Sequence, residues 1–262
     1  MPEGHTIHRL ANDLRRTLSP GPIAASSPQG RFAPGATLLD GAELKRAEAW
    51  GKYLFCTFSN EVVLHIHLGL IGKFRPAPIE EAPSSTIRLR LENQTDCWHL
   101  TGPARCELIT RHEQRLIVGK LGPDPLRARS SVAQFRDNLA HTRLPIGAAL
   151  LDQSVIAGIG NVYRAEVLFL CGIHPGTPSN TLSSQAIDEL WATTKRLLQR
   201  GVRLNRIITT GAHDMTRPIS QRDGDDRLYV YHRTNCRWCG TELTTLHLGG
   251  RPIQFCPHCQ PH

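Results

Sequence analysis

The sequence lacks a long hydrophobic run. No apolar stretch among its 262 residues approaches the ~18–20 residues that a membrane-spanning helix needs. The opening MPEGHTIHRL also lacks the apolar core of a signal peptide. Internal repeats and low-complexity segments are absent as well, and 40% apolar with 21% charged residues is the composition of a folded globular protein. We therefore expect an intracellular, cytoplasmic protein with no membrane partner.

Acidic residues are scarce relative to basic ones. Thirty-one Lys and Arg against 23 Asp and Glu give a net charge of +8. The parts of the chain before and after residue 130 share this excess equally, so it is not a basic tail. Twenty-six of the basic residues are Arg, whose guanidinium binds phosphate through paired hydrogen bonds. The charge favours a polyanionic partner, usually a nucleic acid.

Four of the eight cysteines form one pattern, in which Cys236-x-x-Cys239 and Cys256-x-x-Cys259 are separated by sixteen residues. This is the spacing of a four-cysteine zinc ribbon. In an intracellular chain a metal site is favoured over disulfides. Four thiolates leave no open coordination position, so the predicted cofactor is one structural Zn²⁺. The other four lie among apolar neighbours and are interpreted as buried or idle thiols: Cys56, Cys97, Cys106 and Cys171.

The pattern of apolar residues predicts an α+β multidomain fold. An N-terminal helix over 3–18 precedes short apolar runs, which are typical of an antiparallel β-sandwich or barrel. The breaker-rich segment 119–125 is the natural boundary. We predict a β domain over 1–118, a linker over 119–130, a helical domain over 131–226 and a zinc-ribbon β-hairpin over 227–262. Strands are predicted at 53–58, 62–68, 86–91, 106–110, 228–231 and 253–255, and helices at 131–140, 145–154, 161–171 and 183–200.

The N-terminus carries a candidate nucleophile. Removal of Met1 before a small residue leaves Pro2 with a free secondary amine, and an α-amino group titrates near ~7.7–8.0. Attack of such an amine on a sugar C1′ gives an iminium, an electron sink for elimination chemistry. Glu3 can then act as the general acid and base. Many proteins begin with Met-Pro-Glu by chance, so this dipeptide alone is weak evidence.

Three further segments are candidate phosphate contacts. A helix is predicted to run into Gly158-Ile-Gly-Asn161 and another to begin at Asn161, an N-cap residue whose neighbouring N–H groups can bind phosphate. Lys52 is either a solvated edge lysine or a lysine directed at a phosphate or sugar, and the spacing does not decide between them. Arg251 lies in a Gly-Gly-Arg-Pro turn between the cysteine pairs, where it is a phosphate ligand or one exposed arginine among many. The basic run 195–206 favours DNA backbone binding, although a solvated helix face has the same pattern.

Six motifs occur in a fixed order along essentially the whole chain. Taken together they resemble the formamidopyrimidine-DNA glycosylase/endonuclease VIII family. The opening MPEGHTIHRLA and the segment Ser27–Phe32 are most similar to its actinobacterial endonuclease VIII branch. The motifs are Pro2-Glu3-Gly4, Trp50-Gly-Lys52, His67-Leu-Gly-Leu70, Leu121-Gly-Pro-Asp-Pro-Leu126, Leu151-Asp-Gln with Gly158-Ile-Gly-Asn161-Val-Tyr163, and Gly250-Arg251-Pro252 between the cysteine pairs.

This resemblance implies a bifunctional DNA glycosylase with AP lyase activity, which acts in base excision repair on double-stranded DNA with oxidised bases or abasic sites. It implies a monomer associated with the bacterial nucleoid. By the family pattern, Pro2 attacks C1′ and expels the base while Glu3 transfers protons. Lys52 assists β-elimination and phosphate binding, and Arg251 holds phosphate during δ-elimination.

The resemblance also implies how DNA is held. Asn161, in a helix–two-turn–helix domain, and His67 match residues that contact the DNA backbone. DNA is expected to lie across a cleft between the β and helical domains, with the damaged base flipped out. Leu70 matches the apolar wedge that fills the vacated stack.

Two departures from the family pattern bear on the substrate. Relatives that excise oxidised purines carry an Asp-Pro-Arg-Arg-Phe-Gly loop with two more wedge residues, whereas this chain has Thr101-Gly-Pro-Ala-Arg-Cys106. Thr6 stands where many relatives have Glu. Both differences favour oxidised pyrimidines.

Two other hypotheses remain at this point. A non-catalytic reader of damaged or abasic DNA would have the same fold, yet such a protein is expected to have lost Pro2, Glu3 or Lys52. A zinc-ribbon protein of RNA binding or translation would explain the charge and cysteines but neither the N-terminus nor Gly158–Asn161. The loop 217–227, with its acidic Asp223–Asp226, either contacts the flipped base or is a disordered turn, which we expect.

Overall fold

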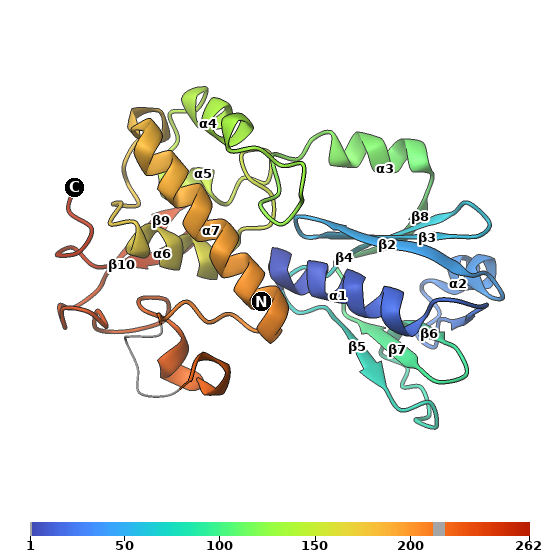
Figure 1. The fold of residues 1–262 in the computed structure, drawn as a ribbon. Helices are drawn as coiled ribbons and strands as arrows, with labels where there is room; N and C mark the ends of the chain where they lie inside the picture. The colour runs from blue at the N-terminus through green and yellow to red at the C-terminus, as the bar shows by residue number, and fades with distance from the viewer. Residues whose placement is uncertain (1, 212–217) are drawn as a thin grey trace. The chain divides into compact units, whose positions relative to one another are not determined.

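A computed structural model describes residues 2–211 and 218–262, and Figure 1 shows its fold. The chain divides into two compact units, Met1–Lys120 and Leu121–His262. This division falls inside the breaker-rich segment 119–125. The finer division of the second unit into a helical domain and a hairpin domain stays a prediction.

The first unit contains two four-stranded antiparallel sheets. One has the order β1-β6-β7-β5 and the other the order β2-β3-β4-β8. Residues such as Leu54 and Leu100, one from each sheet, belong to one buried apolar cluster together with Leu14 of the N-terminal helix. The predicted sandwich with an N-terminal helix is thus confirmed. The strands are β1 (Ala24–Ser26), β2 (Leu44–Trp50), β3 (Tyr53–Phe58), β4 (Val63–His67), β5 (Lys73–Ala77), β6 (Ile87–Glu92), β7 (Cys97–Thr101) and β8 (Arg105–Ile109).

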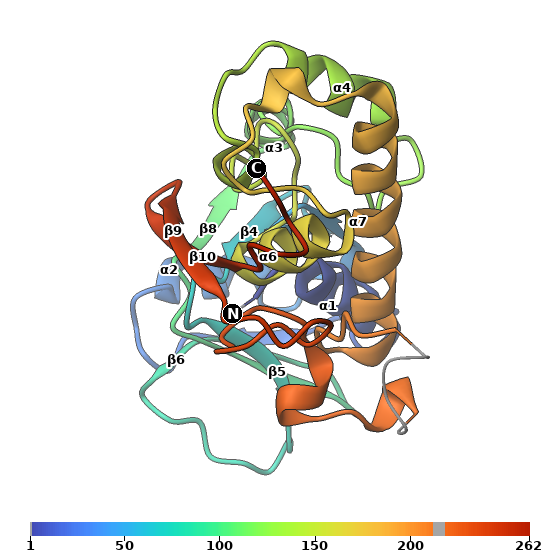
Figure 2. The same cartoon turned by 90° about the vertical axis from the view of Figure 1, so that its left-hand side faces the viewer.

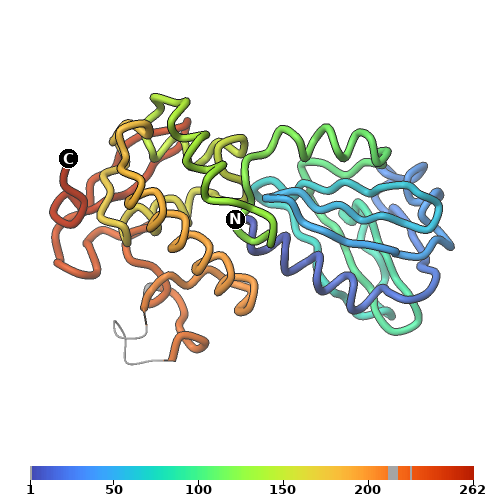
Figure 3. The backbone as a smooth tube through the Cα atoms, turned by 45° about the horizontal axis from the view of Figure 1, so that its top comes forward, coloured from blue at the N-terminus to red at the C-terminus, as the bar shows by residue number. Residues whose placement is uncertain are grey.

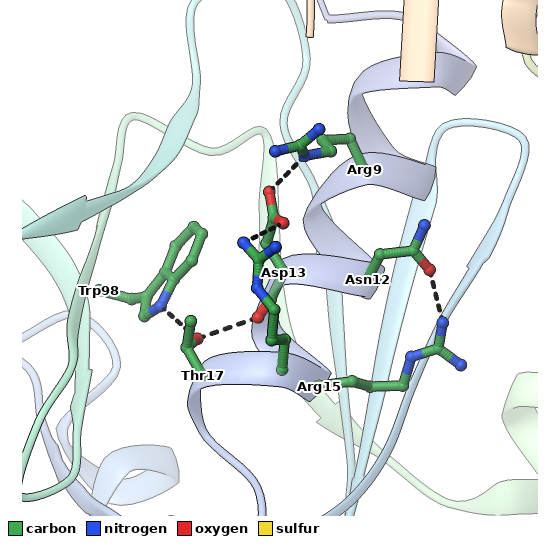
Figure 4. Close-up of polar contacts among 7 residues, drawn as sticks. Arg9, Asn12, Asp13, Arg15, Thr17 and Trp98 are labelled. Carbon is green, nitrogen blue, oxygen red and sulfur yellow. Dashed lines mark hydrogen bonds and ion pairs between the residues drawn. The ribbon is translucent and has the colours of Figure 1, made fainter. Parts of the chain in front are cut away.

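Helix α1 (Gly4–Thr17) buries the face that its apolar spacing predicts, with Ile7, Leu10 and Leu14 in the core. Figure 4 shows how its last turn is held. The Asp13 carboxylate accepts from Arg9 at 2.7 Å and from Arg16 at 2.8 Å. The indole N–H of Trp98, on β7, donates to the Thr17 hydroxyl at 2.9 Å, and this hydroxyl donates to the Asp13 carbonyl at 3.0 Å. These bonds join α1 to one sheet.

Two helices lie within the part of the sequence predicted to contain strands alone. They are α2 (Ala33–Leu39) and α3 (Arg111–Val118). All residues of α3 are described and none of them is buried. No core-facing apolar stripe therefore explains where this helix lies. Its start is fixed by a capping box, in which the Thr110 hydroxyl accepts from the Glu113 N–H and the Glu113 carboxylate accepts from the Thr110 N–H. Such local capping overrides a strand-like composition.

The second unit packs four helices and a β-hairpin around a second apolar cluster. Helix α6 is central, because all of its residues except the last are buried. Figure 2 shows it beside the hairpin, and Figure 3 follows the backbone of the unit as a tube. The elements are α4 (Val132–Ala140), α5 (Ile146–Ala149), α6 (Asn161–Leu170), α7 (Ser184–Leu204), β9 (Thr244–Leu248) and β10 (Arg251–Phe255), with short 3-10 turns at Ser179–Thr181, Ile219–Gln221 and Gly224–Arg227.

Three predictions for this unit are wrong. The helix predicted at 145–154 is limited to the four residues of α5, and turns lead from it to Gly158, so no helix runs into that glycine. The predicted strand at 228–231 is irregular, because its N–H groups bind a carboxylate in place of a partner strand. The disordered turn expected over 217–227 begins at a residue outside the described ranges. Its remainder forms two 3-10 turns, and Arg222 between them is buried and donates to the Thr210 carbonyl.

Candidate active site and metal centre

The residues at the start of the chain are held by the first turn of α1. Pro2 is half-buried, and Glu3 is the fully buried N-cap residue of the helix. The Glu3 carbonyl accepts from the Thr6 N–H at 2.9 Å. Burial lowers the pKa of His5 to about 4, with a smaller contribution from the positive charge of the chain's N-terminus. The His5 imidazole is therefore neutral at pH 7.

Lys52 lies in the tight turn that joins β2 to β3. Trp50 and Tyr53 are paired across the strands, so Gly51 and Lys52 are the two central residues. Gly51 has a φ of +56°, and a glycine with positive φ at the first central position is typical of a type II′ hairpin turn. The turn thereby places Lys52 at the end of the sheet.

His67 and Arg105 lie at the same end of this sheet. His67 is the last residue of β4 and is paired with Tyr53 on one side and Arg105 on the other. The Tyr53 and His67 ring centroids are 5.1 Å apart. Burial lowers the pKa of His67, and the charges of Lys52 and Arg105 lower it further. Three basic groups thus gather where an anion can bind. The sequence indicated two of them, while Arg105 is found only from the register of β8.

The loop between β4 and β5 presents two apolar side chains to solvent. Leu70 is 54% exposed and Ile71 is 80% exposed. Gly69 has a φ of +68°, and a Cβ on it would lie 2.8 Å from the Ala104 Cβ. A Cβ on Gly72 would lie 2.2 Å from the Leu68 carbonyl oxygen. The turn requires these two glycines, which hold the exposed pair in place.

In the second unit, Asn161 and Arg251 lie on contacting elements. Asn161 is the first residue of α6, and Gly160 takes the N-cap position that was predicted for Asn161. The Asn161 amide donates to the Pro252 carbonyl at 3.1 Å, and its Oδ1 has no hydrogen-bond partner among the described residues. Arg251 opens β10 after a turn whose two glycines both have positive φ, as a type I′ turn requires. The start of α6 and the hairpin that carries Arg251 are therefore in direct contact.

The four predicted metal-binding cysteines form one cluster. Their sulfur atoms all lie within 4.8 Å of one another. The Cys236–Cys259 distance is 3.9 Å, the Cys239–Cys259 distance 3.5 Å and the Cys239–Cys256 distance 3.4 Å. Four sulfurs bound at ~2.3 Å to one tetrahedral ion lie about 3.8 Å apart, so the cluster fits a metal of this size. Gln260 braces the second pair, accepting from the Cys256 N–H at 3.0 Å and donating to the Ile173 carbonyl at 2.8 Å.

The remaining thiols fit their interpretation as idle groups. Cys56 and Cys97 are buried, and Cys106 and Cys171 are half-buried. Burial raises the pKa of both Cys56 and Cys106 to about 12 and that of Cys171 to about 11. Because the thiolate is the nucleophilic form, these three cysteines are poor nucleophiles at neutral pH.

Among the described residues, no helix is long and apolar enough to cross a membrane.

Comparison with known proteins identifies this combination of units. The model of the formamidopyrimidine-DNA glycosylase N-terminal domain matches residues 1–105, and the model of the formamidopyrimidine-DNA glycosylase H2TH domain matches residues 121–212. The chain belongs to the formamidopyrimidine-DNA glycosylase/endonuclease VIII family. Members of this family are DNA glycosylases with AP lyase activity, so the chain is a DNA glycosylase of damaged-base repair.

Two relatives match along nearly their whole length. "Endonuclease 8 1" of Mycobacterium tuberculosis is 42% identical over 269 residues, covering 99% of this chain and 100% of the relative. A formamidopyrimidine-DNA glycosylase of Synechococcus is 31% identical, covering 100% and 98%. Wild-type Lactococcus lactis Fpg in complex with DNA containing an oxidised pyrimidine has a TM-score of 0.81 at 25% identity, with full coverage of both chains. The complex of that enzyme with abasic-site DNA has a TM-score of 0.80 at 26% identity and covers 99% of this chain.

Proposed function

We propose that this glycosylase excises oxidised bases, pyrimidines in preference to purines, from double-stranded DNA and then cleaves the strand as an AP lyase. The observation that carries the proposal is the placement of Pro2 and Glu3 at the start of α1, which packs on β2 and β3. The hairpin between those strands carries Lys52. A candidate amine, carboxylate and phosphate-binding cation therefore belong to one compact unit. We propose that the enzyme acts as a monomer.

The reaction begins with the Pro2 amine, freed by removal of Met1. Its nitrogen forms a bond to C1′ while the bond from C1′ to the base breaks, and the base leaves with a proton that Glu3 delivers. Opening of the sugar ring breaks the C1′–O4′ bond, transfers the proton from the Pro2 nitrogen to O4′ through the Glu3 carboxylate, and gives the iminium. Loss of a C2′ proton to a base then expels the 3′ phosphate, and loss of the C4′ proton expels the 5′ phosphate. Water finally hydrolyses the iminium, which releases the sugar remnant and restores the Pro2 amine.

The DNA backbone is held at two places. In the first unit, Lys52 and His67 bind phosphate, and Arg105 adds a second positive charge beside that of Lys52. In the second unit, Asn161 and Arg251 bind phosphate near the start of α6, where helix N–H groups also favour an anion. Arg251 keeps its phosphate while the strand is cleaved. Binding of DNA by this chain is supported by its similarity to Lactococcus Fpg, which is solved in complex with abasic-site DNA and with DNA containing an oxidised pyrimidine.

The preference for pyrimidines rests on the loops that would enter the duplex. Leu70 fills the space of the flipped base, and the exposed Ile71 lies beside it. The neighbouring loop offers Gly102, Pro103 and Ala104 and so no large wedge of its own. The relative that shares 42% identity is an endonuclease 8. Thymine glycol in a matched duplex should therefore be excised faster than 8-oxoguanine, and the reverse order would exclude this substrate assignment.

The cysteine cluster holds one Zn²⁺ in the proposed function. All four sulfurs are used as ligands, so the ion supplies folding energy to the hairpin and takes no part in the reaction. Its identity is checked by metal analysis of the purified protein, which should give one zinc per chain. Iron or another metal at that stoichiometry would contradict the assignment.

The decisive experiment is borohydride trapping on a duplex with one abasic site, followed by intact mass spectrometry and peptide mapping. An adduct on Pro2 of protein that lacks Met1 is the expected result, because reduction of the iminium gives a stable amine. The matched control is the same protein with Met1 retained, which should give no adduct. If the processed protein binds the duplex but forms no adduct, the lyase proposal fails and a non-catalytic reader of abasic DNA takes its place.

A further inference from the structure

Arg164 is a fully buried arginine on α6, one turn after Asn161. Its Nη1 donates to the Gly147 carbonyl at 2.7 Å and to the Leu248 carbonyl at 2.8 Å. Its Nη2 donates to the carbonyls of Arg251 and Pro252, both at 3.1 Å. One guanidinium thus binds four backbone oxygens from three separate segments of the second unit.

Three of these oxygens belong to the β9–β10 hairpin and flank its turn. Leu248 is the last residue before the two turn glycines and Arg251 is the first residue after them. A hairpin of two strands is marginally stable by itself, and two glycines make the turn more permissive still. The position of the turn in space therefore depends on what holds its two ends, and Arg164 binds both of them.

The guanidinium suits this task in shape as well as in charge. It is planar, presents five N–H donors in fixed directions and stays protonated in proteins. A lysine at the same place would offer three donors around one point and could not reach both ends of the turn with the same geometry.

We propose that Arg164 is the positioning residue for Arg251. It fixes the ends of the hairpin turn against the start of α6, so that Asn161 and Arg251 contact the DNA backbone as one preformed site. Because the Arg164 side chain has no exposed surface, it touches no phosphate and acts through Arg251 alone. This inference rests on the proposed function of Arg251 and adds to it the residue on which that function depends.

The test compares Arg164→Met, Arg251→Ala and the double variant with wild type. Affinity for abasic-site duplex is measured from 50 to 300 mM salt, together with the ratio of δ- to β-elimination product. We expect Arg164→Met to weaken binding about tenfold, as the loss of one charge-assisted hydrogen bond does. The slope of log K against log salt should fall by ~0.9, the value for one phosphate contact. The elimination ratio should fall as it does in Arg251→Ala.

The double variant separates positioning from general damage. If Arg164 acts through Arg251, Arg164→Met causes no further loss once Arg251 is alanine. Additive losses, or an unchanged salt slope and product ratio in Arg164→Met that retains its zinc, would overturn the proposal. If Arg164→Met fails to fold, Arg164→Lys decides, because it keeps the charge but loses the fork. Wild-type behaviour of that variant would then overturn the inference.

The matched control is Arg90→Met in the first unit. Arg90 is also buried and donates to two backbone carbonyls, those of Ile79 and Glu81, at 2.7 and 2.8 Å. Its loss should lower stability but leave the salt slope and the elimination ratio at wild-type values. If Arg251→Ala itself behaves as wild type, the proposed role of Arg251 fails. If Arg251→Ala shows the loss and folded Arg164→Met does not, only the positioning role fails.

Discussion

The two units hold their functional residues by different physical means. In the first unit, Lys52 and His67 lie at the ends of regular strands, and ladder hydrogen bonds with an apolar core fix them. In the second unit, the turn that carries Arg251 is held by a buried guanidinium and a cysteine cluster. A buried carboxylate, Glu166, holds the segment 229–231, which precedes the hairpin.

Helix α6 carries both of these buried charges, two residues apart. Arg164 binds only backbone carbonyls in the contacts given above, whereas Glu166 accepts from the N–H groups of Tyr229, Val230 and Tyr231 at 2.8–2.9 Å and from the Thr209 hydroxyl. Burial raises the pKa of Glu166, and these hydrogen bonds oppose that rise. The difference teaches that charge-to-backbone contacts order the irregular segment 229–231 in place of strand pairing, and that they also hold the paired β9–β10 hairpin against α6.

Metal removal should give the largest difference between the units. Structural zinc contributes its binding energy to local folding, so chelation or Cys256→Ser should disorder the hairpin. Limited proteolysis should then cut within 232–262 at least tenfold faster, while fragments of the first unit remain resistant. The measurement is a digestion time course followed by mass spectrometry, with Cys171→Ser as the control. Equal sensitivity of both units would show that they are not ordered independently.

Loss of the Glu166 carboxylate should be the next largest effect. Glu166→Leu leaves three buried N–H groups without an acceptor, which costs about 3 kcal/mol or more in the free energy of unfolding. Glu166→Gln keeps one oxygen acceptor and should lose less. Denaturant titration measures both. If the leucine variant is as stable as wild type, the backbone of 229–231 is held by other contacts and the contrast between the units weakens.

His5 should make the first unit sensitive to acid. Its pKa is about 4 in the folded protein and 6.5 as a free side chain, so between these values the unfolded chain binds a proton that the folded protein does not. Stability therefore falls as the pH falls from 6.5 toward 4, by about 3 kcal/mol in total for this group. His5→Gln should flatten that part of the curve of Tm against pH. If Tm falls toward acid pH as steeply in this variant as in wild type, other groups cause the loss of stability.

The contact between α1 and β7 should give the smallest effect. Trp98→Phe removes the indole N–H that donates to Thr17 and leaves the ring's packing against Phe74, so we expect a loss of about 1 kcal/mol. Urea unfolding monitored by circular dichroism measures it. A loss above 3 kcal/mol would show that the end of α1 depends on this bond more than on its apolar face.

The same contrast explains what the sequence could predict. Helix α1 and strands β3, β4, β6 and β8 follow from apolar periodicity, and their predicted bounds agree with the structure to within one or two residues. The cysteine cluster follows from the spacing of two Cys-x-x-Cys pairs, which is typical of a metal-binding zinc ribbon. Helix α3 lies where short apolar runs predict strands alone, and local capping at Thr110 fixes its start. The strand predicted at 228–231 is irregular, because the alternation of its residues is the same whether its N–H groups bind a strand or a carboxylate.

The candidate site shows the same limit. Pro2, Glu3 and the cysteines are visible as motifs, whereas Arg105 is found only through strand register and Arg164 only through its contacts. One signal for Arg164 was available, because it lies three residues after Asn161 and therefore on the same side of a helix. Without the structure, nothing indicates that the hairpin turn lies against that side.

The partners of Arg164 and Glu166 are backbone atoms, and this has a consequence for how the protein can vary. A carbonyl or an N–H group is the same in almost every residue, so positions such as 229–231 and 248 can change their side chains without loss of these contacts. Substitutions there are expected to accumulate with no compensating change on α6. Correlated substitution between positions, which finds most contacts in alignments of related sequences, should therefore be blind to the contacts that order this half of the enzyme.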